Sequence, residues 1–288
     1  MSRDQAWGEQ KKMTMAKFYD RRYFQVISET YKHLTYQYVQ RIVSAMVEAC
    51  ARKKDVLLDV GCGIGWLLEV GRNIGCDVTG IDIALSGIKV AKERLGNTNF
   101  VVSDAHFFPF RDKAFDVVSC VWLLEHVENP EQVLKEIFRV LSARGYAVVM
   151  SPSGELRASR RRSPKDTLFE RFGEEEFGEE HYWEFSPMGL QHIVEKAGFA
   201  ILERRGIYRF HYFNLFTFPF YKILSSILKR PMGQTSEGVT RKPFTLVRKP
   251  LLLLIQDFFK LFSRLEMRLG NKAPFNLFGI ETLIVGRK

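Results

Sequence analysis

Cysteine is scarce in this chain of 288 residues, which contains four: Cys50, Cys62, Cys76 and Cys120. They form no C-x-x-C pair, the spacing that is typical of a structural zinc site. We therefore expect free thiols in a reducing compartment, and no disulfide or zinc. The N-terminal residues are polar and charged and lack the apolar core of a secretory signal, so we expect a cytoplasmic protein.

An uninterrupted apolar run of membrane-spanning length is also missing. The most apolar segment, residues 210–228, is broken by Asn214, Pro219 and Lys222, so it is not expected to cross a bilayer. We find no internal repeat. With 46% hydrophobic residues the chain can bury one core plus an elaboration. We expect one domain with insertions.

The most informative segment is residues 55–66, DVLLDVGCGIGW. An apolar strand pattern runs into Gly61, Gly63 and Gly65 before a helical pattern begins. Glycine permits positive φ and the close approach of a ligand, and the helix that follows offers free N–H groups. This turn indicates a nucleotide-like cofactor, and a plain tight connection is the alternative interpretation.

Polar residues follow the next strand patterns as well. Residues 77–82 end in Asp82, about twenty residues after the glycines, residues 99–103 precede Asp104, and residues 115–120 precede LLEHV. Helical patterns at 64–73, 84–95 and 130–141 alternate with these strands, which predicts right-handed crossovers and a parallel sheet. Because ligands bind at the carboxyl ends of such strands, the polar residues point to one crevice.

These segments resemble the class I S-adenosylmethionine-dependent methyltransferases, of the type 11-like group. The matching pieces are LLDVGCGIG, GIDIA, SDAHFFPFRDKAFDVVSCVWLLEHVENPEQVLKEIFRVL, GYAVVMSPS, HYWEFSPMGLQHIVEKAGF and the closing ETLIVGRK. A dehydrogenase would carry G-x-G-x-x-G, whereas here G-x-G-x-G follows an acid by two residues. The resemblance implies an α/β fold with a Rossmann-like, doubly wound, seven-stranded sheet, mostly parallel with the last strand antiparallel. It also implies S-adenosyl-L-methionine as the cofactor.

We expect three parts in the chain. Residues 1–53 form an N-terminal helical cap, residues 54–206 plus 279–288 form the methyltransferase domain, and residues 207–278 form a helical insertion before the last strand. Relatives have a short connection at that point. The charged stretch 152–185 is interpreted as a solvated loop, with a lid over the acceptor as the alternative.

The resemblance also assigns the cofactor site. Gly61, Gly63 and Gly65 lie beneath the methionine part, and Asp59 binds its amino group directly or through water. Asp82 binds the ribose hydroxyls, and Ile83 lies on the adenine face. Asp104 with Ala105 contacts the adenine edge, and Trp122 and Leu123 contribute backbone on the methionine side.

Catalysis needs few residues, because the sulfonium is an activated leaving group and the protein mainly aligns the acceptor. His126 is the candidate base, since it follows the fourth strand and histidine titrates near neutral pH; a purely structural role for it is the alternative. Glu125-His126 resembles a quinone O-methyltransferase branch that binds a divalent metal, but Trp122 replaces the supporting acid, so we expect no metal. Acceptor-side candidates, which also fit plain packing, are Tyr19, Tyr23, His181 and Tyr182.

The insertion has an unusual composition. Residues 207–278 hold twelve Lys and Arg against three acids, a net +9 of the chain's +10, and fourteen of its thirty-eight aromatic residues. In residues 251–269 apolar side chains recur at helical spacing, while Lys260, Arg264 and Arg268 line another face. This pattern predicts an amphipathic helix on an anionic membrane surface. A helix packed on the protein's own core has the same pattern.

We therefore expect methyl transfer to a lipophilic acceptor, such as a quinone precursor, polyprenyl compound or lipid head group, at a membrane surface. The alternative enzyme is a soluble small-molecule methyltransferase whose insertion covers the active site or forms a dimer contact. A degenerate binding protein is disfavoured by the intact acids Asp59, Asp82 and Asp104. A nucleic-acid partner is disfavoured because the insertion segregates its apolar and basic faces. The oligomeric state stays open.

Overall fold

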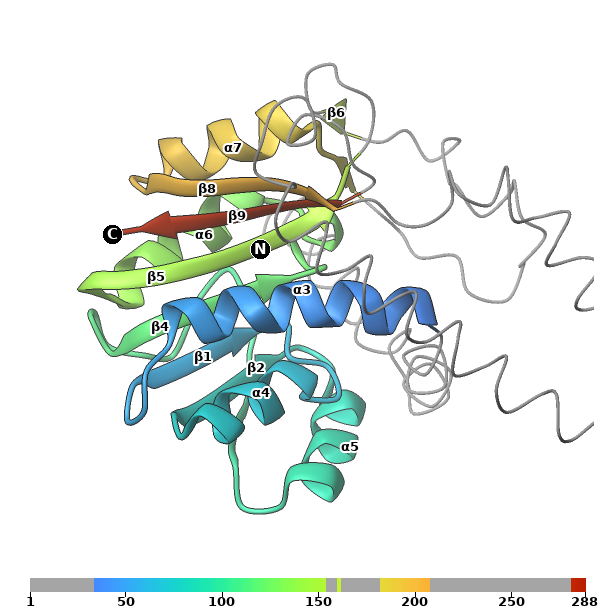
Figure 1. Ribbon diagram of the computed structural model, residues 1–288, viewed down its shortest axis with the longest axis vertical. Helices are drawn as coiled ribbons and strands as arrows, with labels where there is room; N and C mark the ends of the chain where they lie inside the picture. The colour runs from blue at the N-terminus through green and yellow to red at the C-terminus, as the bar shows by residue number, and fades with distance from the viewer. Residues whose placement is uncertain (1–33, 154–159, 162–181, 208–280) are drawn as a thin grey trace, which may run out of the picture.

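The computed structural model describes residues 34–153, 160–161, 182–207 and 281–288. Within these ranges a seven-stranded sheet lies between helices (Figure 1). Two short strands, β6 (Arg160–Arg161) and β7 (Trp183–Glu184), pair separately. The strands of the main sheet are β1 (Val56–Val60), β2 (Asp77–Asp82), β3 (Asn99–Val102), β4 (Phe115–Val121), β5 (Leu141–Pro152), β8 (Ala200–Ile207) and β9 (Glu281–Arg287).

The strands are arranged in the order β3-β2-β1-β4-β5-β9-β8. The first five in this order are parallel, and β9 runs antiparallel to both β5 and β8. The chain winds outward from β1 in both directions, so the first strand lies in the interior of the sheet. This topology confirms the expected doubly wound, mostly parallel sheet with an antiparallel last strand.

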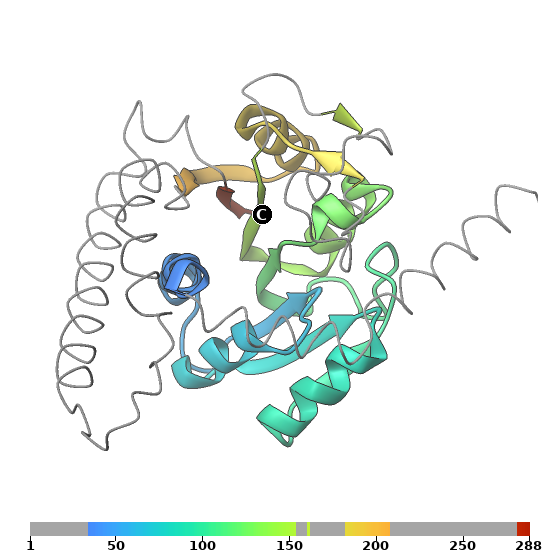
Figure 2. The same cartoon turned by 90° about the vertical axis from the view of Figure 1, so that its right-hand side faces the viewer.

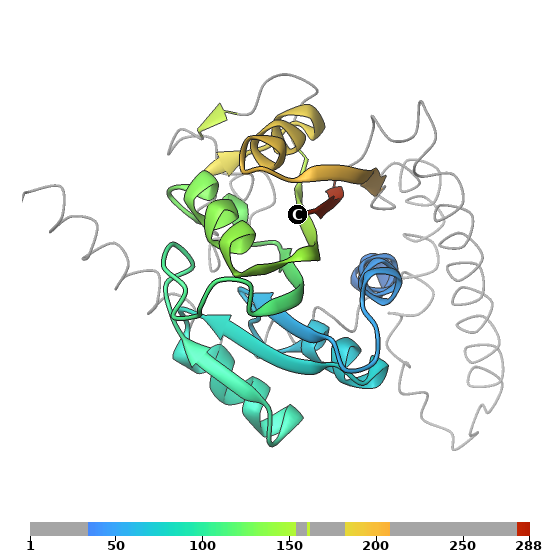
Figure 3. The same cartoon turned by 90° about the vertical axis from the view of Figure 1, so that its left-hand side faces the viewer.

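Helices cover both faces of the sheet. Those on one face are α3 (Leu34–Cys50), α4 (Trp66–Ile74) and α5 (Leu85–Leu95), and those on the other are α6 (Pro130–Val140) and α7 (Pro187–Lys196). Figures 2 and 3 show the two layers from the two ends of the strands. Local sequence sets the helix starts: Asn129 caps α6, its side chain accepting from the Gln132 N–H at 3.1 Å, and Pro130 occupies the first turn.

The core has two halves, one on each face of the sheet. On the α3 face, Val39, Ile42, Val43 and Val47 are fully buried. Their spacing places them on one face of the helix, which lies within the predicted helical cap of residues 1–53. Burying each such side chain contributes about 1.5–3 kcal/mol. This apolar stripe therefore fixes α3 across the sheet, although the helix precedes the first strand.

Several described segments end at one edge of the sheet, the edge where the parallel strands terminate (Figure 1). Ile207, the last residue of β8, pairs with Glu281, the first residue of β9, which also pairs with Pro152 at the end of β5. Residues 208–280 therefore leave and rejoin the fold at this carboxyl edge. Most of the predicted insertion and most of the predicted cap lie outside the described residues, so the division into three parts stays a prediction.

Candidate functional site

The carboxyl edge brings together the predicted cofactor residues, which follow four neighbouring strands. The glycines follow β1, and Asp82 ends β2 with Ile83 directly after it. Asp104 and Ala105 follow β3, and Trp122 and Leu123 follow β4. Figure 2 faces this edge. Because β3, β2, β1 and β4 are adjacent in that order, these residues lie on neighbouring strand ends. A single crevice among them stays a prediction. The role of each residue stays a prediction.

The glycine turn needs glycine at alternate positions. Gly61, Gly63 and Gly65 have φ values of 72°, 49° and 77°, in the left-handed region that side chains rarely adopt. A Cβ on Gly61 would lie 3.0 Å from the Leu123 side chain, and one on Gly65 would lie 2.8 Å from Leu95. The turn thus packs against the β4 end on one side and α5 on the other.

The first three N–H groups of this turn donate within the protein. Those of Gly61 and Cys62 both donate to the carbonyl of Ile81, at 2.9 and 3.0 Å, and that of Gly63 donates to Oδ2 of Asp82 at 2.8 Å. A dinucleotide turn aims such groups at a pyrophosphate. Here these N–H groups donate to β2 and so connect the turn to that strand. The turn therefore fits a cofactor that has no phosphate, such as S-adenosylmethionine.

Two carboxylates lie behind the turn, on the α3 and α4 face. Asp59 is 3% exposed and accepts from the Ser119 hydroxyl at 2.7 Å. Burial raises the pKa of Asp59 to about 7; the Ser119 hydrogen bond opposes this rise and the charge of Asp82 adds to it. Burial also raises the pKa of Asp82, against hydrogen bonds from the backbone of Ala84, Gly63 and Ile83. A cationic ligand such as the methionine ammonium would compensate this buried negative charge.

The adenine-side residues lie in the loop after β3. Asp104 and Ala105 are both half-buried, and Ala105 packs against the core on the α6 face. The side chain of His106 approaches Asp104, with Nδ1 2.6 Å from Oδ1. Sequence reasoning missed His106, although its place two residues after the predicted adenine-edge acid was a usable signal.

Trp122 adopts a strained backbone at the end of β4. Its φ of 55° is unusual for a bulky residue, and its N–H donates to the carbonyl of Met150 at 3.0 Å. The indole lies 6.4 Å from that of Trp66, centroid to centroid, and its Nε1 donates to Glu281 at 2.9 Å. The predicted backbone role of Trp122 is therefore accompanied by side-chain contacts to the α4 start and the β9 start, which the sequence did not indicate.

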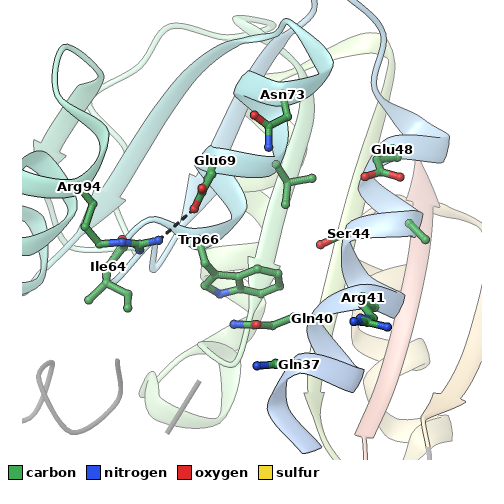
Figure 4. Close-up of a pocket in the computed structure, with 12 residues that line it drawn as sticks. Gln37, Gln40, Arg41, Ser44, Glu48, Ile64, Trp66, Glu69, Asn73 and Arg94 are labelled. Carbon is green, nitrogen blue, oxygen red and sulfur yellow. Dashed lines mark hydrogen bonds and ion pairs between the residues drawn. The ribbon is translucent and has the colours of Figure 1, made fainter. Parts of the chain in front are cut away.

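An open groove of about 760 Å³ lies between α3 and α4 (Figure 4). Its lining is mostly polar, and Arg94 forms an ion pair with Glu69 at 3.0 Å. Arg94 also donates to the carbonyl of Ile64 and so supports the glycine turn from outside. None of the predicted cofactor residues lines this groove. The lining residues are Gln37, Gln40, Arg41, Ser44, Ala45, Glu48, Ile64, Trp66, Glu69, Val70, Asn73 and Arg94.

His126, the candidate base, lies in a short 3₁₀ turn (Leu124–His126) just after β4. Its side chain is 11% exposed, and Nε2 lies 4.0 Å from Oε1 of Glu125. Glu125 is buried and accepts from the Ser151 hydroxyl at 2.9 Å. A buried carboxylate at this distance would stabilise an imidazolium, and the same contacts would anchor a structural histidine.

One predicted acceptor-side residue lies beside this turn. The N–H of Tyr182 donates to the carbonyl of Glu125 at 2.7 Å. The other candidates, Tyr19, Tyr23 and His181, lie outside the described residues. In the described part of the chain, no three His, Cys, Asp or Glu side chains are arranged to hold a metal ion.

Comparisons with known proteins agree on the family. Residues 31–204, more than half of the chain, match the family model of the methyltransferase domain. Ubiquinone biosynthesis O-methyltransferase of Psychrobacter arcticus is 32% identical over 170 residues, 54% of this chain and 62% of the relative. Demethylmenaquinone methyltransferase of Renibacterium salmoninarum is 37% identical over 93 residues, 32% of this chain and 39% of the relative. Sterol 4-C-methyltransferase of Caenorhabditis elegans is 34% identical over 98 residues, 32% of this chain and 29% of the relative.

Solved structures share the fold. A methyltransferase from Thermotoga maritima, described as a possible histamine N-methyltransferase, has a TM-score of 0.53 at 17% identity, covering 93% of this chain and 97% of that one. The 1,6-didemethyltoxoflavin-N1-methyltransferase of Burkholderia thailandensis, solved with S-adenosylhomocysteine, also has a TM-score of 0.53 at 17% identity, covering 71% and 83%.

The chain matches these curated relatives over 29% to 62% of their own length, so the similarity identifies a shared domain and does not identify the acceptor. The match to the family model, the strand order and the internally bonded N–H groups of the glycine turn agree with one another. The chain belongs to the methyltransferase domain family, in the class I group whose cofactor is S-adenosyl-L-methionine.

Proposed function

We propose that this protein transfers the methyl group of S-adenosylmethionine to a lipophilic acceptor at a membrane surface. The acceptor is a quinone precursor, a polyprenyl compound or a lipid head group. The observation that carries the proposal is the pairing of Ile207 with Glu281 at the carboxyl edge. Because of it, residues 208–280, with their excess of basic and aromatic side chains, are attached to the edge where the acceptor must meet the cofactor.

The chemistry asks the protein to align a nucleophile with the methyl group and, for an oxygen or carbon acid, to remove a proton. S-adenosylmethionine supplies the activated methyl group. We assign removal of the acceptor's proton to His126. The buried carboxylate of Glu125, 4.0 Å away, would stabilise the imidazolium form that results. Tyr182, held against this turn by its backbone, is the described candidate for contact with the acceptor.

Membrane attachment is supported by the composition of the insertion and by apolar exposure near the cofactor edge. Leu85 at the start of α5, Val102 at the end of β3 and Phe107 in the loop after β3 are 52%, 51% and 68% exposed. Such side chains favour an apolar environment when they gather at one edge. In the described ranges no helix is long and apolar enough to cross a bilayer. We propose a cytoplasmic protein that binds an anionic leaflet from one side.

The names of the relatives support a lipophilic acceptor. Ubiquinone, menaquinone and sterols are poorly soluble in water, and they appear in the names of proteins that are 32% to 37% identical to parts of this chain. Enzymes that modify such compounds must reach them in a bilayer. A basic and amphipathic insertion at the catalytic edge would meet that requirement.

The test uses purified full-length protein, S-adenosylmethionine with a trideuterated methyl group, and a total lipid extract presented in liposomes. We expect a lipid-phase species that gains the deuterated methyl group. At a concentration of S-adenosylmethionine that does not saturate the enzyme, Asp82→Ala protein should form less of this species, because its cofactor affinity is lower. A labelled product confined to the aqueous fraction would support the soluble small-molecule alternative instead. Lipid profiling of a deletion strain should reveal the acceptor as a species lighter by one methyl group.

A further inference from the structure

His106 forms a chain of contacts around Asp104. Its imidazole Nδ1 lies 2.6 Å from Asp104 Oδ1, and its backbone N–H donates to the same oxygen at 2.9 Å. The other ring nitrogen, Nε2, accepts from the backbone N–H of Asn129 at 3.2 Å. Because a backbone N–H can only donate, the neutral ring carries its proton on Nδ1. That proton is therefore donated to Asp104.

Asn129, whose backbone N–H donates to the His106 ring, is itself held in place by the start of α6. Asn129 caps α6, and Gln132 in the first turn of this helix donates from its side chain to the carbonyl of His106 at 3.4 Å. The side chains of His106 and Asp104 are 15% and 23% exposed, so water competes with their contact only partly. The imidazole thus connects the loop after β3 to the start of α6.

The same loop is anchored a second time, farther from Asp104. Glu136 of α6 accepts from the Phe108 N–H at 2.8 Å, and Arg139 donates to the carbonyls of Phe108 and Phe110 at 3.2 and 2.8 Å. These contacts hold the loop without touching Asp104. Loop anchoring and carboxylate orientation therefore belong to different side chains, which allows them to be tested separately.

We propose that His106 is a positioning residue that orients the Asp104 carboxylate to recognise the 6-amino group of adenine. Both His106 contacts use Oδ1, which fixes the rotation of the carboxylate and the direction of Oδ2. A carboxylate only accepts and a 6-amino group donates, whereas the 6-oxo group of hypoxanthine is an acceptor. The orientation therefore favours adenine over hypoxanthine. This role rests on the prediction that Asp104 contacts the adenine edge.

The experiment measures selectivity as well as affinity. The full-length protein is titrated calorimetrically with S-adenosylhomocysteine and with S-inosylhomocysteine, which carries hypoxanthine in place of adenine. Wild type binds the adenine ligand more tightly. His106→Leu lowers this preference by about tenfold, because the orienting donor is lost. The change comes mainly from a lower affinity for S-adenosylhomocysteine. His106→Asn, whose amide N–H can replace Nδ1–H, keeps most of the preference.

Two controls make the result decisive. Arg139→Lys weakens the second anchor and should lower the affinity for both ligands in parallel, leaving their ratio unchanged. In an Asp104→Asn background, His106→Leu should change the ratio no further, since the two residues act as one unit. Should His106→Leu fail to fold, His106→Ser supplies the same loss of the orienting ring.

Equal losses for both ligands in His106→Leu would overturn the proposal and leave His106 as a loop support. A wild type that binds both ligands equally would also overturn it, because Asp104 would then not contact the 6-position. In that case binding of S-adenosylhomocysteine itself keeps the cofactor assignment intact. Failure to bind either ligand would instead remove the cofactor assignment on which the proposed function depends.

Discussion

Asp82 accepts a hydrogen bond from the backbone N–H of Gly63 at 2.8 Å, so the end of β2 is bonded directly to the middle of the glycine turn. The second oxygen of the same carboxylate accepts from the Ala84 N–H at 2.8 Å. The side chain that is predicted to bind the ribose hydroxyls thus also sets the shape of the turn beneath the methionine. Recognition of the sugar and support of the turn depend on one residue.

Replacing Asp82 with alanine should therefore weaken S-adenosylhomocysteine binding by about 1–3 kcal/mol, because buried N–H donors lose their acceptor together with the ribose contact. Calorimetry measures the change. Asp77→Ala, at the exposed start of the same strand, is the matched control and should bind like wild type. An Asp82→Ala protein with wild-type affinity would contradict the ribose assignment.

Stability should depend on pH through Asp59, whose pKa is raised from 3.8 to about 7 by burial. The folded state binds more protons than the unfolded state between these values, so the contribution of Asp59 to stability is present at low pH and is lost as pH rises through 7. Asp59→Asn keeps an acceptor for Ser119 and does not titrate. Its stability relative to wild type should rise by about 2–3 kcal/mol between pH 5 and pH 8.

Urea unfolding of both proteins at the two pH values measures this difference. Glu48→Gln, an exposed acid of α3, serves as the control and should show no such dependence. A constant difference between Asp59→Asn and wild type would mean that the carboxyl group titrates normally in the folded protein.

Cofactor binding should release protons for the same reason. The ammonium of the methionine part favours the ionised form of Asp59 and lowers the pKa of this carboxyl from about 7. Affinity should then rise as pH increases from about 5 to 7 and level off above that range. Titrations at pH 6.5 in two buffers with different ionisation enthalpies count the protons released, and Asp59→Asn should release fewer.

His126→Ala should reduce turnover by about 10²- to 10⁴-fold, the usual range for loss of a general base, while the affinity for S-adenosylhomocysteine is kept. Steady-state rates with the lipid acceptor and calorimetry measure the two quantities. His126→Gln keeps hydrogen bonding without basicity and should be as slow as the alanine variant. If the glutamine variant keeps wild-type turnover, His126 is a loop support and the acceptor ionises without it.

Changing Lys260, Arg264 and Arg268 to glutamate should detach the protein from liposomes that contain anionic lipid, because this attraction is electrostatic and screened by salt. Removing Phe258 and Phe262 should weaken binding even at low salt through lost apolar burial. Flotation measures both. If the segment packs on the protein's own core instead, the charge changes will be nearly silent and the phenylalanine changes will lower the melting temperature.

In the control for this experiment, three exposed lysines elsewhere in the chain are changed to glutamate: Lys53, Lys89 and Lys92. It makes the same change in net charge, so only the position of the charges differs. We expect it to float almost like wild type. Equal detachment by both triple variants would show that net charge alone governs binding and would remove the role of the amphipathic stripe.

Much of the fold was predictable because its signals are local in sequence. Residues 77–82 were predicted as a strand and form β2, and the three alternating glycines all have positive φ. The helical pattern predicted at 130–141 corresponds to α6, which begins at Pro130. Each signal is local: either apolar residues recur at the spacing of a strand or helix, or a glycine or proline restricts the backbone conformation.

The features of the site that the sequence did not predict depend on contacts between residues that lie far apart in the chain. Asp59 meets Ser119 sixty residues later, and Trp122 meets Glu281 after 159 residues. Neither partner is marked by any pattern near its own position. The tautomer of His106 likewise depends on the backbone of Asn129, which only the folded arrangement of β3 and α6 brings near.

The position of β9 has a consequence for how the molecule reaches its native state. This strand enters between β5 and β8 and is separated from β8 by the whole of residues 208–280. Until it arrives, β5 and β8 each present an unpaired edge, and unpaired edges invite aggregation. Because pairings between distant parts of a chain form slowly, closure of the sheet should be the late step of folding. A chain stopped before Glu281 should leave the ribosome with an open sheet.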